Sequence, residues 1–206
     1  MRTISVASRK GGQGKSFLTR AIAVLALMNG KSVGIVDTDP QGTVALWGKR
    51  RPHASPTVVH IGSGTIERHL ATFRKAGAEL VAIDTPPNVA PIINVAVTQS
   101  DSALIVSGVY GEDLEQVAVL AQMMTKLKKP SAIILNRVPQ GASALREAKN
   151  ALLTFRLPIC PVAIVQRVSH PYASVDGLTA SEREPNSKAA DELAKMYAWL
   201  GKEGLV

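Results

Sequence analysis

The sequence predicts an α/β fold: a single-domain, mostly parallel, twisted sheet with helices on both faces. Short apolar runs rich in Val and Ile alternate along the chain with longer amphipathic stretches, and no internal repeat or Ser/Gly-rich linker interrupts them. Strands that are apolar on both faces and separated by helices are typical of parallel sheets with right-handed crossovers. The length of 206 residues suits one domain with one sizeable core.

The elements follow from this alternation. Seven strands are predicted, at residues 3–8, 32–37, 57–61, 79–84, 102–107, 131–136 and 161–165. Helices are predicted between them, at about 15–29, 44–49, 66–76, 114–127 and 142–154. Apolar residues at three- and four-residue spacings near the end of the chain predict a closing amphipathic helix that packs on the sheet. We expect residues 1–206 to form one domain, with no helix-turn-helix extension before the first strand.

Charge and composition favour some classes of function and exclude others. The chain carries 24 Lys and Arg against 16 Asp and Glu, a net charge of +8, which suggests a polyanionic partner such as nucleic acid. The single cysteine, Cys160, excludes an internal disulfide and a four-thiolate metal site. No apolar run approaches the length of a membrane span, no signal peptide is recognisable, and the acidic residues near the C-terminus argue against a membrane anchor. A cytoplasmic protein is expected.

A glycine-rich segment, RKGGQGKS at residues 9–16, lies between the first predicted strand and the first predicted helix. Its glycines allow the backbone to curl so that N–H groups point at phosphate oxygens, and the helix start adds its positive dipole end. Lys15 would neutralise the β- and γ-phosphates, and the Ser16 hydroxyl would bind Mg²⁺. The candidate phosphate-binding residues are Lys10, Gly11, Gly12, Gln13, Gly14, Lys15 and Ser16.

Acidic residues end two of the predicted strands. The segment DTDPQ places Asp37 and Asp39 after the second strand, and DTPP places Asp84 after a later one. Because the carboxyl ends of neighbouring parallel strands converge, these carboxylates are expected near the γ-phosphate.

The segment KGGxGKS departs from the general phosphate-loop pattern, because Arg9 stands where that pattern has glycine. With the additional Lys10, it closely resembles the deviant phosphate loop of the ParA/MinD family of dimeric ATPases. The resemblance implies that Lys10 is the signature lysine that reaches the partner's nucleotide across a dimer interface. It also implies that Asp37 orients the attacking water, that Asp84 is linked to Mg²⁺ directly or through water, and that Asp39 orders the surrounding loop. Phe17 is a departure, since a second Thr usually follows the loop.

Two later segments also resemble the family. Asn136 ends the strand SAIILN, where the family's asparagine hydrogen-bonds adenine. Residues 167–177 look like the family segment that closes over the base, which leaves Arg167 either a role in the nucleotide pocket, at the dimer face or on DNA, or plain packing.

The resemblance implies an ATP-dependent switch with slow, partner-stimulated hydrolysis. ATP and Mg²⁺ would promote a homodimer that binds DNA non-specifically on the nucleoid, without a membrane, and drives plasmid or chromosome partition with a ParB-type partner. The alternatives are a ParA-like positioning ATPase for a protein cargo and a metabolic ligase of the dethiobiotin-synthetase kind, which Lys10 argues against. The candidate DNA contacts are Lys49, Arg50, Arg51, Lys126, Lys128, Lys129, Arg146, Lys149 and Arg156.

Overall fold

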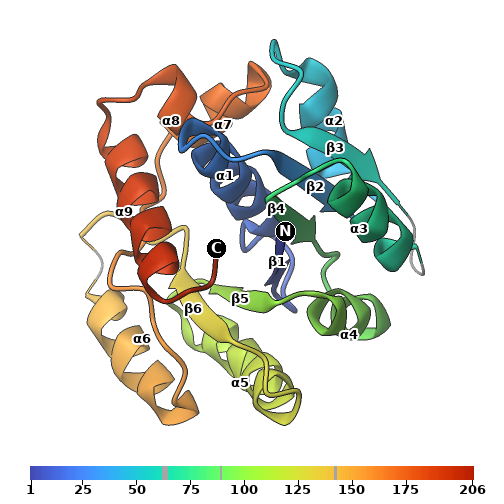
Figure 1. The fold of residues 1–206 in the computed structure, drawn as a ribbon. Helices are drawn as coiled ribbons and strands as arrows, with labels where there is room; N and C mark the ends of the chain where they lie inside the picture. Colours follow the sequence, from blue (N-terminus) through green and yellow to red (C-terminus); the bar gives the residue numbers. More distant parts are fainter. Residues whose placement is uncertain (62–64, 89, 142) are drawn as a thin grey trace.

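The computed structural model describes residues 1–61, 65–88, 90–141 and 143–206. These residues form a parallel six-stranded sheet in the order β3-β2-β4-β1-β5-β6 (Figure 1). The strands are β1 (Arg2–Ala7), β2 (Val33–Asp37), β3 (Thr57–His60), β4 (Leu80–Asp84), β5 (Ser102–Ser107) and β6 (Ser131–Leu135). The predicted fold class is therefore confirmed, as are six of the seven predicted strands.

The seventh prediction, a strand at 161–165, is wrong for the described chain. Residues 159–165 run beside β6 but make only isolated bridges, Ile159 with Ile133 and Val165 with Val138. Cys160 N–H bonds to Ile133 O and Ile164 N–H to Leu135 O, so this segment advances four residues while β6 advances two, and a regular ladder cannot form.

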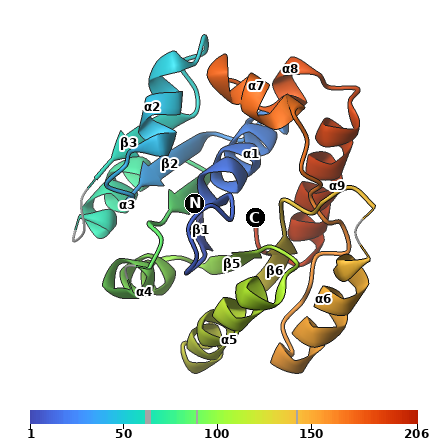
Figure 2. The ribbon, with the colours of Figure 1, turned by 180° about the vertical axis from the view of Figure 1, so that it is seen from behind.

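Helices cover both faces of the sheet (Figures 1 and 2). One hydrophobic core joins a face of the sheet to α1, α2 and α9, and two others join the opposite face to α3, α4, α5 and α6. The described helices are α1 (Lys15–Met28), α2 (Thr43–Arg50), α3 (Ile66–Lys75), α4 (Ala90–Gln99), α5 (Gly111–Lys126), α6 (Ala144–Leu152), α7 (Ser169–Val175), α8 (Ala180–Arg183) and α9 (Lys188–Lys202), with a 3₁₀ turn at Leu153–Phe155.

All the predicted helices are present, including the closing helix α9, whereas α4, α7 and α8 were not predicted. Residue 142, the expected first residue of α6, lies outside the described residues. None of the described helices is long and apolar enough to cross a membrane.

The strand register brings two of the predicted site residues together. Asp37 pairs with Asp84 across β2 and β4, and Asp84 pairs with Val6 across β4 and β1. The phosphate-loop segment follows β1 directly, so these acidic strand ends and the loop share one edge of the sheet.

Candidate functional site

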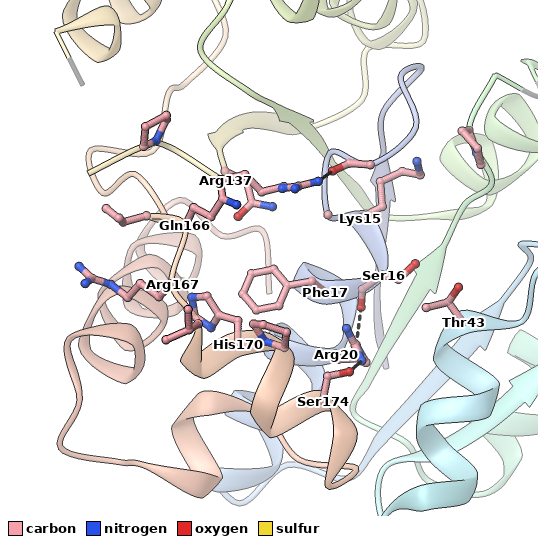
Figure 3. A pocket seen from close by; sticks show the side chains of 18 of the residues that line it. Lys15, Ser16, Phe17, Arg20, Thr43, Arg137, Gln166, Arg167, His170 and Ser174 are labelled. Atoms are coloured by element: carbon pink, nitrogen blue, oxygen red, sulfur yellow. Dashed lines mark hydrogen bonds between the residues drawn. The ribbon is translucent and has the colours of Figure 1, made fainter. Parts of the chain in front are cut away.

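A cavity of about 870 Å³ lies where the start of α1, the end of β6 and α7 meet (Figure 3). A cavity of this volume can accept a nucleotide. The residues that line it include Gly12, Gly14, Lys15 and Ser16 before and within α1, Asp39 and Thr43 near α2, Asn136 and Arg137 after β6, and Arg167 and His170 near α7. The predicted phosphate loop therefore opens into a cavity of suitable size.

The glycine-rich segment adopts a conformation suited to an anion. Gly12 and Gly14 have φ values of 76° and 87°, which residues with a Cβ rarely adopt. Within the described residues, no side chain caps the start of α1 at Lys15, so the first N–H groups of the helix face the cavity edge without a side-chain acceptor. Burial lowers the pKa of Lys15, and the carboxylates of Asp84 and Asp39 oppose this shift. A bound phosphate would supply the counter-charge.

Asp84 lies beside the start of α1 as predicted. Its carboxylate is fully buried and accepts hydrogen bonds from Ser16 Oγ at 2.6 Å and Thr19 Oγ1 at 3.1 Å. Burial raises the pKa of Asp84 to about 7, against the effect of the two hydroxyl donors. No cluster of three or more His, Cys, Asp or Glu that could hold a metal occurs in the described part of the chain. A hydroxyl beside a carboxylate nevertheless fits Mg²⁺, which takes few protein ligands and completes its shell with phosphate and water oxygens.

Asp37 does not occupy the position expected of a residue that orients water. Its carboxylate is fully buried, and Oδ2 accepts the N–H groups of Val44 at 3.0 Å and Ala45 at 2.9 Å, while Oδ1 accepts that of Asp39 at 3.1 Å. Burial raises the pKa of Asp37, and these backbone donors oppose the rise. Asp37 thus stabilises the N-terminus of α2, whose first N–H groups need acceptors. Asp37 is not among the residues that line the cavity, and its water-orienting role stays a prediction.

Asp39 is the carboxylate of the DTDPQ segment that lines the cavity. It is 8% exposed, and its Oδ1 accepts the N–H of Gln41 at 3.0 Å. The Asp39 carbonyl oxygen lies 2.9 Å from His60 Nε2, which fixes the loop against the end of β3. Asp39 therefore makes bonds within the loop that it is expected to order, and it also lines the cavity.

Lys10 is held within its own chain at the start of α5. Its Nζ donates to Asp113 Oδ1 at 2.8 Å and to Glu112 Oε2 at 3.2 Å, and these bonds raise its pKa. Asp113 also accepts a bond of 2.7 Å from Gln13 Nε2. Sequence reasoning missed these acidic partners, although paired carboxylates in the first turn of a helix are a recognisable signal.

Arg20 is a further cavity residue that was not predicted. Its guanidinium donates to Ser16 O at 3.0 Å and to Ser174 Oγ at 2.6 Å, and so connects α1 to α7 (Figure 3). Burial lowers its pKa to about 10. The signal available in the sequence was that Arg20 is a cation in the largely apolar part of α1 that follows Ser16. Arg167 lines the same cavity and pairs with Glu192 of α9 at 2.5 Å.

The predicted DNA contacts do not form one face. Figures 1 and 2 both place α2 far from α5 and α6. The side chain of Arg51 is 2% exposed and is bonded to Glu182 at 2.7 Å, which contradicts its assignment as a DNA contact. The Nζ groups of Lys129 and Lys149 donate to the backbone carbonyls of Ser100 and Pro161. The exposed members of the set are Lys49, Arg50, Lys126, Lys128, Arg146 and Arg156.

Comparisons with known proteins agree with this geometry. The family described as CobQ/CobB/MinD/ParA nucleotide binding domain matches residues 4–178. The chain is 29% identical to maintenance of carboxysome distribution protein A of Gloeobacter kilaueensis, over 92% of this chain and 89% of the relative. It is 24% identical to the protein of the same name in Halothiobacillus neapolitanus, over 93% and 92%. A Cyanothece McdA variant in complex with ATP shares the fold, with a TM-score of 0.76, 18% identity and coverage of 98% and 96%.

Proposed function

The chain belongs to the CobQ/CobB/MinD/ParA family of nucleotide-binding domains, and we propose that it is an ATP-dependent switch that positions a protein cargo. The observation that carries this proposal is that the KGGxGKS loop and Asp39 line one cavity, with Asp84 bonded to Ser16 of the loop and Lys10 bonded to Asp113 at the start of α5. In this proposal ATP binding favours a dimer, and hydrolysis returns the chain to the monomer.

Each site residue has a defined task in the proposed reaction. The N–H groups at the start of α1 and the Lys15 ammonium bind the phosphates, and Ser16 and Asp84 hold Mg²⁺. Bound Mg²⁺ supplies neutralisation of the charge that develops on the phosphates. Asp39 orients the attacking water from the cavity wall, while Asp37 maintains the start of α2. Because a carboxylate is a weak base, slow intrinsic turnover that a partner accelerates is expected.

Lys10 provides the proposed link between ATP and dimerisation. Its bonds to Glu112 and Asp113 satisfy the ammonium within one chain. We propose that, when two ATP-bound chains meet, Lys10 leaves these carboxylates for the partner's nucleotide, where the phosphate charge is larger.

We expect Lys10→Ala to retain ATP binding within about threefold of the wild-type affinity but to remain monomeric in ATP, because Lys10 acts across the interface. Calorimetry measures the affinity, and size exclusion with light scattering measures the mass. Lys31→Ala, which changes a partly exposed lysine beyond α1, is the control. A Lys10→Ala protein that dimerises and hydrolyses ATP like the wild type would refute the assignment.

A protein cargo is better supported than DNA partition with a ParB-type partner, which the sequence favoured. Both curated relatives are named for carboxysome distribution. We infer from this that the chain distributes a protein assembly, with a partner that belongs to that cargo. A metabolic ligase remains less favoured, because it gives Lys10 no task.

Non-specific DNA is proposed as the surface on which the switch acts, supported by the net charge of +8. We expect duplex binding to appear with ATP and to be lost with ADP or without nucleotide, because dimerisation doubles the basic surface. The logarithm of the affinity should fall against that of the salt concentration with a slope of about −0.9 per phosphate contacted. Binding that is equal in all three nucleotide states would contradict this proposal.

The two separated basic clusters provide a matched comparison. A variant with Arg146→Ala and Arg156→Ala removes four cations from a dimer, so the salt slope should become shallower by up to about 3.6 if these residues face DNA. A variant with Lys49→Ala and Arg50→Ala also removes four cations from a dimer, but at the end of α2, beside α7. Since the clusters lie on different sides of the molecule, we expect only one variant to change the slope.

A further inference from the structure

Two side chains directly after β6 bind backbone carbonyls of the phosphate loop. Asn136 Nδ2 donates to the carbonyl oxygen of Gln13 at 2.7 Å, and Arg137 Nη1 donates to that of Gly12. Consecutive carbonyls of the loop are therefore bound by consecutive residues after the strand. Figure 3 shows Arg137 extending from the end of β6 toward the loop.

The approach of Asn136 to the loop is close and buried. Asn136 is 1% exposed, and its backbone N–H is bonded to Ser107 O at 2.8 Å, which fixes it to the end of β5. A Cβ placed on Gly14 would lie 2.2 Å from Asn136 Nδ2. The glycine at this position is thus required by the asparagine as well as by the φ of 87°.

Arg137 adopts an unusual backbone conformation to make its contact. Its φ is 56°, in the left-handed region that residues with a Cβ seldom occupy. Such conformations persist where surrounding contacts impose them, and they concentrate at functional sites. The bond from Arg137 to Gly12 O is a contact of the kind that imposes such a conformation, and the Arg137 side chain also lines the cavity.

From these contacts we infer that Asn136 and Arg137 are positioning residues that keep the phosphate loop ready for an anion before any nucleotide binds. When the carbonyls of Gly12 and Gln13 are held, the peptide planes that carry them are fixed, and the directions of the N–H groups in these planes are fixed with them. A loop that is already ordered loses less conformational entropy on binding, so affinity for phosphate rises whichever base is attached. This inference rests on the proposed nucleotide binding and assigns Asn136 a task other than the expected contact with adenine.

Ligands that carry different bases, or no base, distinguish a role of Asn136 in positioning the loop from a contact with adenine. We expect Asn136→Leu, which keeps the approximate size of the side chain but has neither a donor nor a charge, to weaken Mg²⁺-ATP, Mg²⁺-GTP and Mg²⁺-pyrophosphate binding by the same factor. Loss of one buried hydrogen bond corresponds to roughly five- to tenfold. Arg137→Ala should give a smaller loss of the same kind, because its contact is exposed. Arg74→Ala, an exposed arginine of α3, serves as the control.

A second measurement requires no nucleotide. Amide hydrogen exchange of residues 11–15 in the nucleotide-free protein should be faster in Asn136→Leu and Arg137→Ala than in the wild type and in Arg74→Ala. A loss confined to ATP, together with unchanged loop exchange, would overturn the inference and restore the adenine contact. A wild-type chain that binds neither ATP nor pyrophosphate would contradict the proposed function instead. The hydrogen-exchange comparison would still test whether Asn136 and Arg137 keep the loop ordered.

Discussion

Lys15→Ala is expected to weaken binding of Mg²⁺-ATP by about a hundredfold or more. Lys15 is the buried cation of the loop, and its ammonium lacks the stabilisation that bulk water gives an exposed lysine. Removing one member of a buried charge pair costs about 2–5 kcal/mol, which corresponds to a loss of affinity between about thirtyfold and several thousandfold, and the expected hundredfold lies within this range. Isothermal titration calorimetry with ATP and with ADP would measure it.

Lys75→Ala is the matched control for Lys15→Ala, because Lys75 ends α3 and is exposed. The control should bind ATP like the wild type. If Lys15→Ala also binds ATP within a few-fold of the wild type while it remains folded by circular dichroism, the cavity is not the phosphate site.

Asp39→Ala and Asp37→Ala are expected to have different effects, although the residues are two positions apart. Asp39→Ala should reduce single-turnover hydrolysis about a hundredfold or more with little change in ATP affinity, because a positioned carboxylate that activates water contributes about that factor. Asp39 lines the cavity but is not one of the residues proposed to bind phosphate or Mg²⁺, so its loss should leave those contacts in place. Rapid-quench measurement of ADP formation would test this.

Asp37→Ala should instead reduce the stability of the fold. It removes the acceptor of three backbone N–H groups, two of which begin α2. The loss of such a helix-end acceptor costs about 0.5–2 kcal/mol, with more for donors left buried. Urea denaturation would measure the change. If Asp37→Ala keeps wild-type stability and loses hydrolysis while Asp39→Ala hydrolyses normally, the roles are reversed.

The sequence predicted much of the fold because hydrophobic periodicity is local. Strands β1 to β6 and helix α9 follow from patterns of apolar residues within one segment. The segment 161–165 has the same apolar character, but its backbone does not keep register with β6, and a local pattern of apolar residues cannot show this. Helices α7 and α8 are held largely by contacts with distant residues, such as that of Arg51 with Glu182, and these contacts leave no period in the sequence.

The candidate site was predicted as a set of residues more successfully than as a set of roles. The spacing of KGGxGKS and the two acidic strand ends placed Lys15, Ser16 and Asp84 together. Which carboxylate of DTDPQ faces the cavity depends on how the chain turns after β2, and the turn directs Asp37 to the start of α2. Similarly, a basic run cannot show that Arg51 is buried, because its partner Glu182 lies 131 residues away.

The mass of the chain in solution is the most direct test of an ATP-controlled switch. Light scattering after size exclusion would compare Asp39→Ala, which holds ATP without consuming it, in Mg²⁺-ATP, in Mg²⁺-ADP and without nucleotide. We predict a mass near twice 21.8 kDa with ATP and near 21.8 kDa in the other two states. The same mass in all three states, with ATP binding demonstrated in the same sample, would contradict the switch.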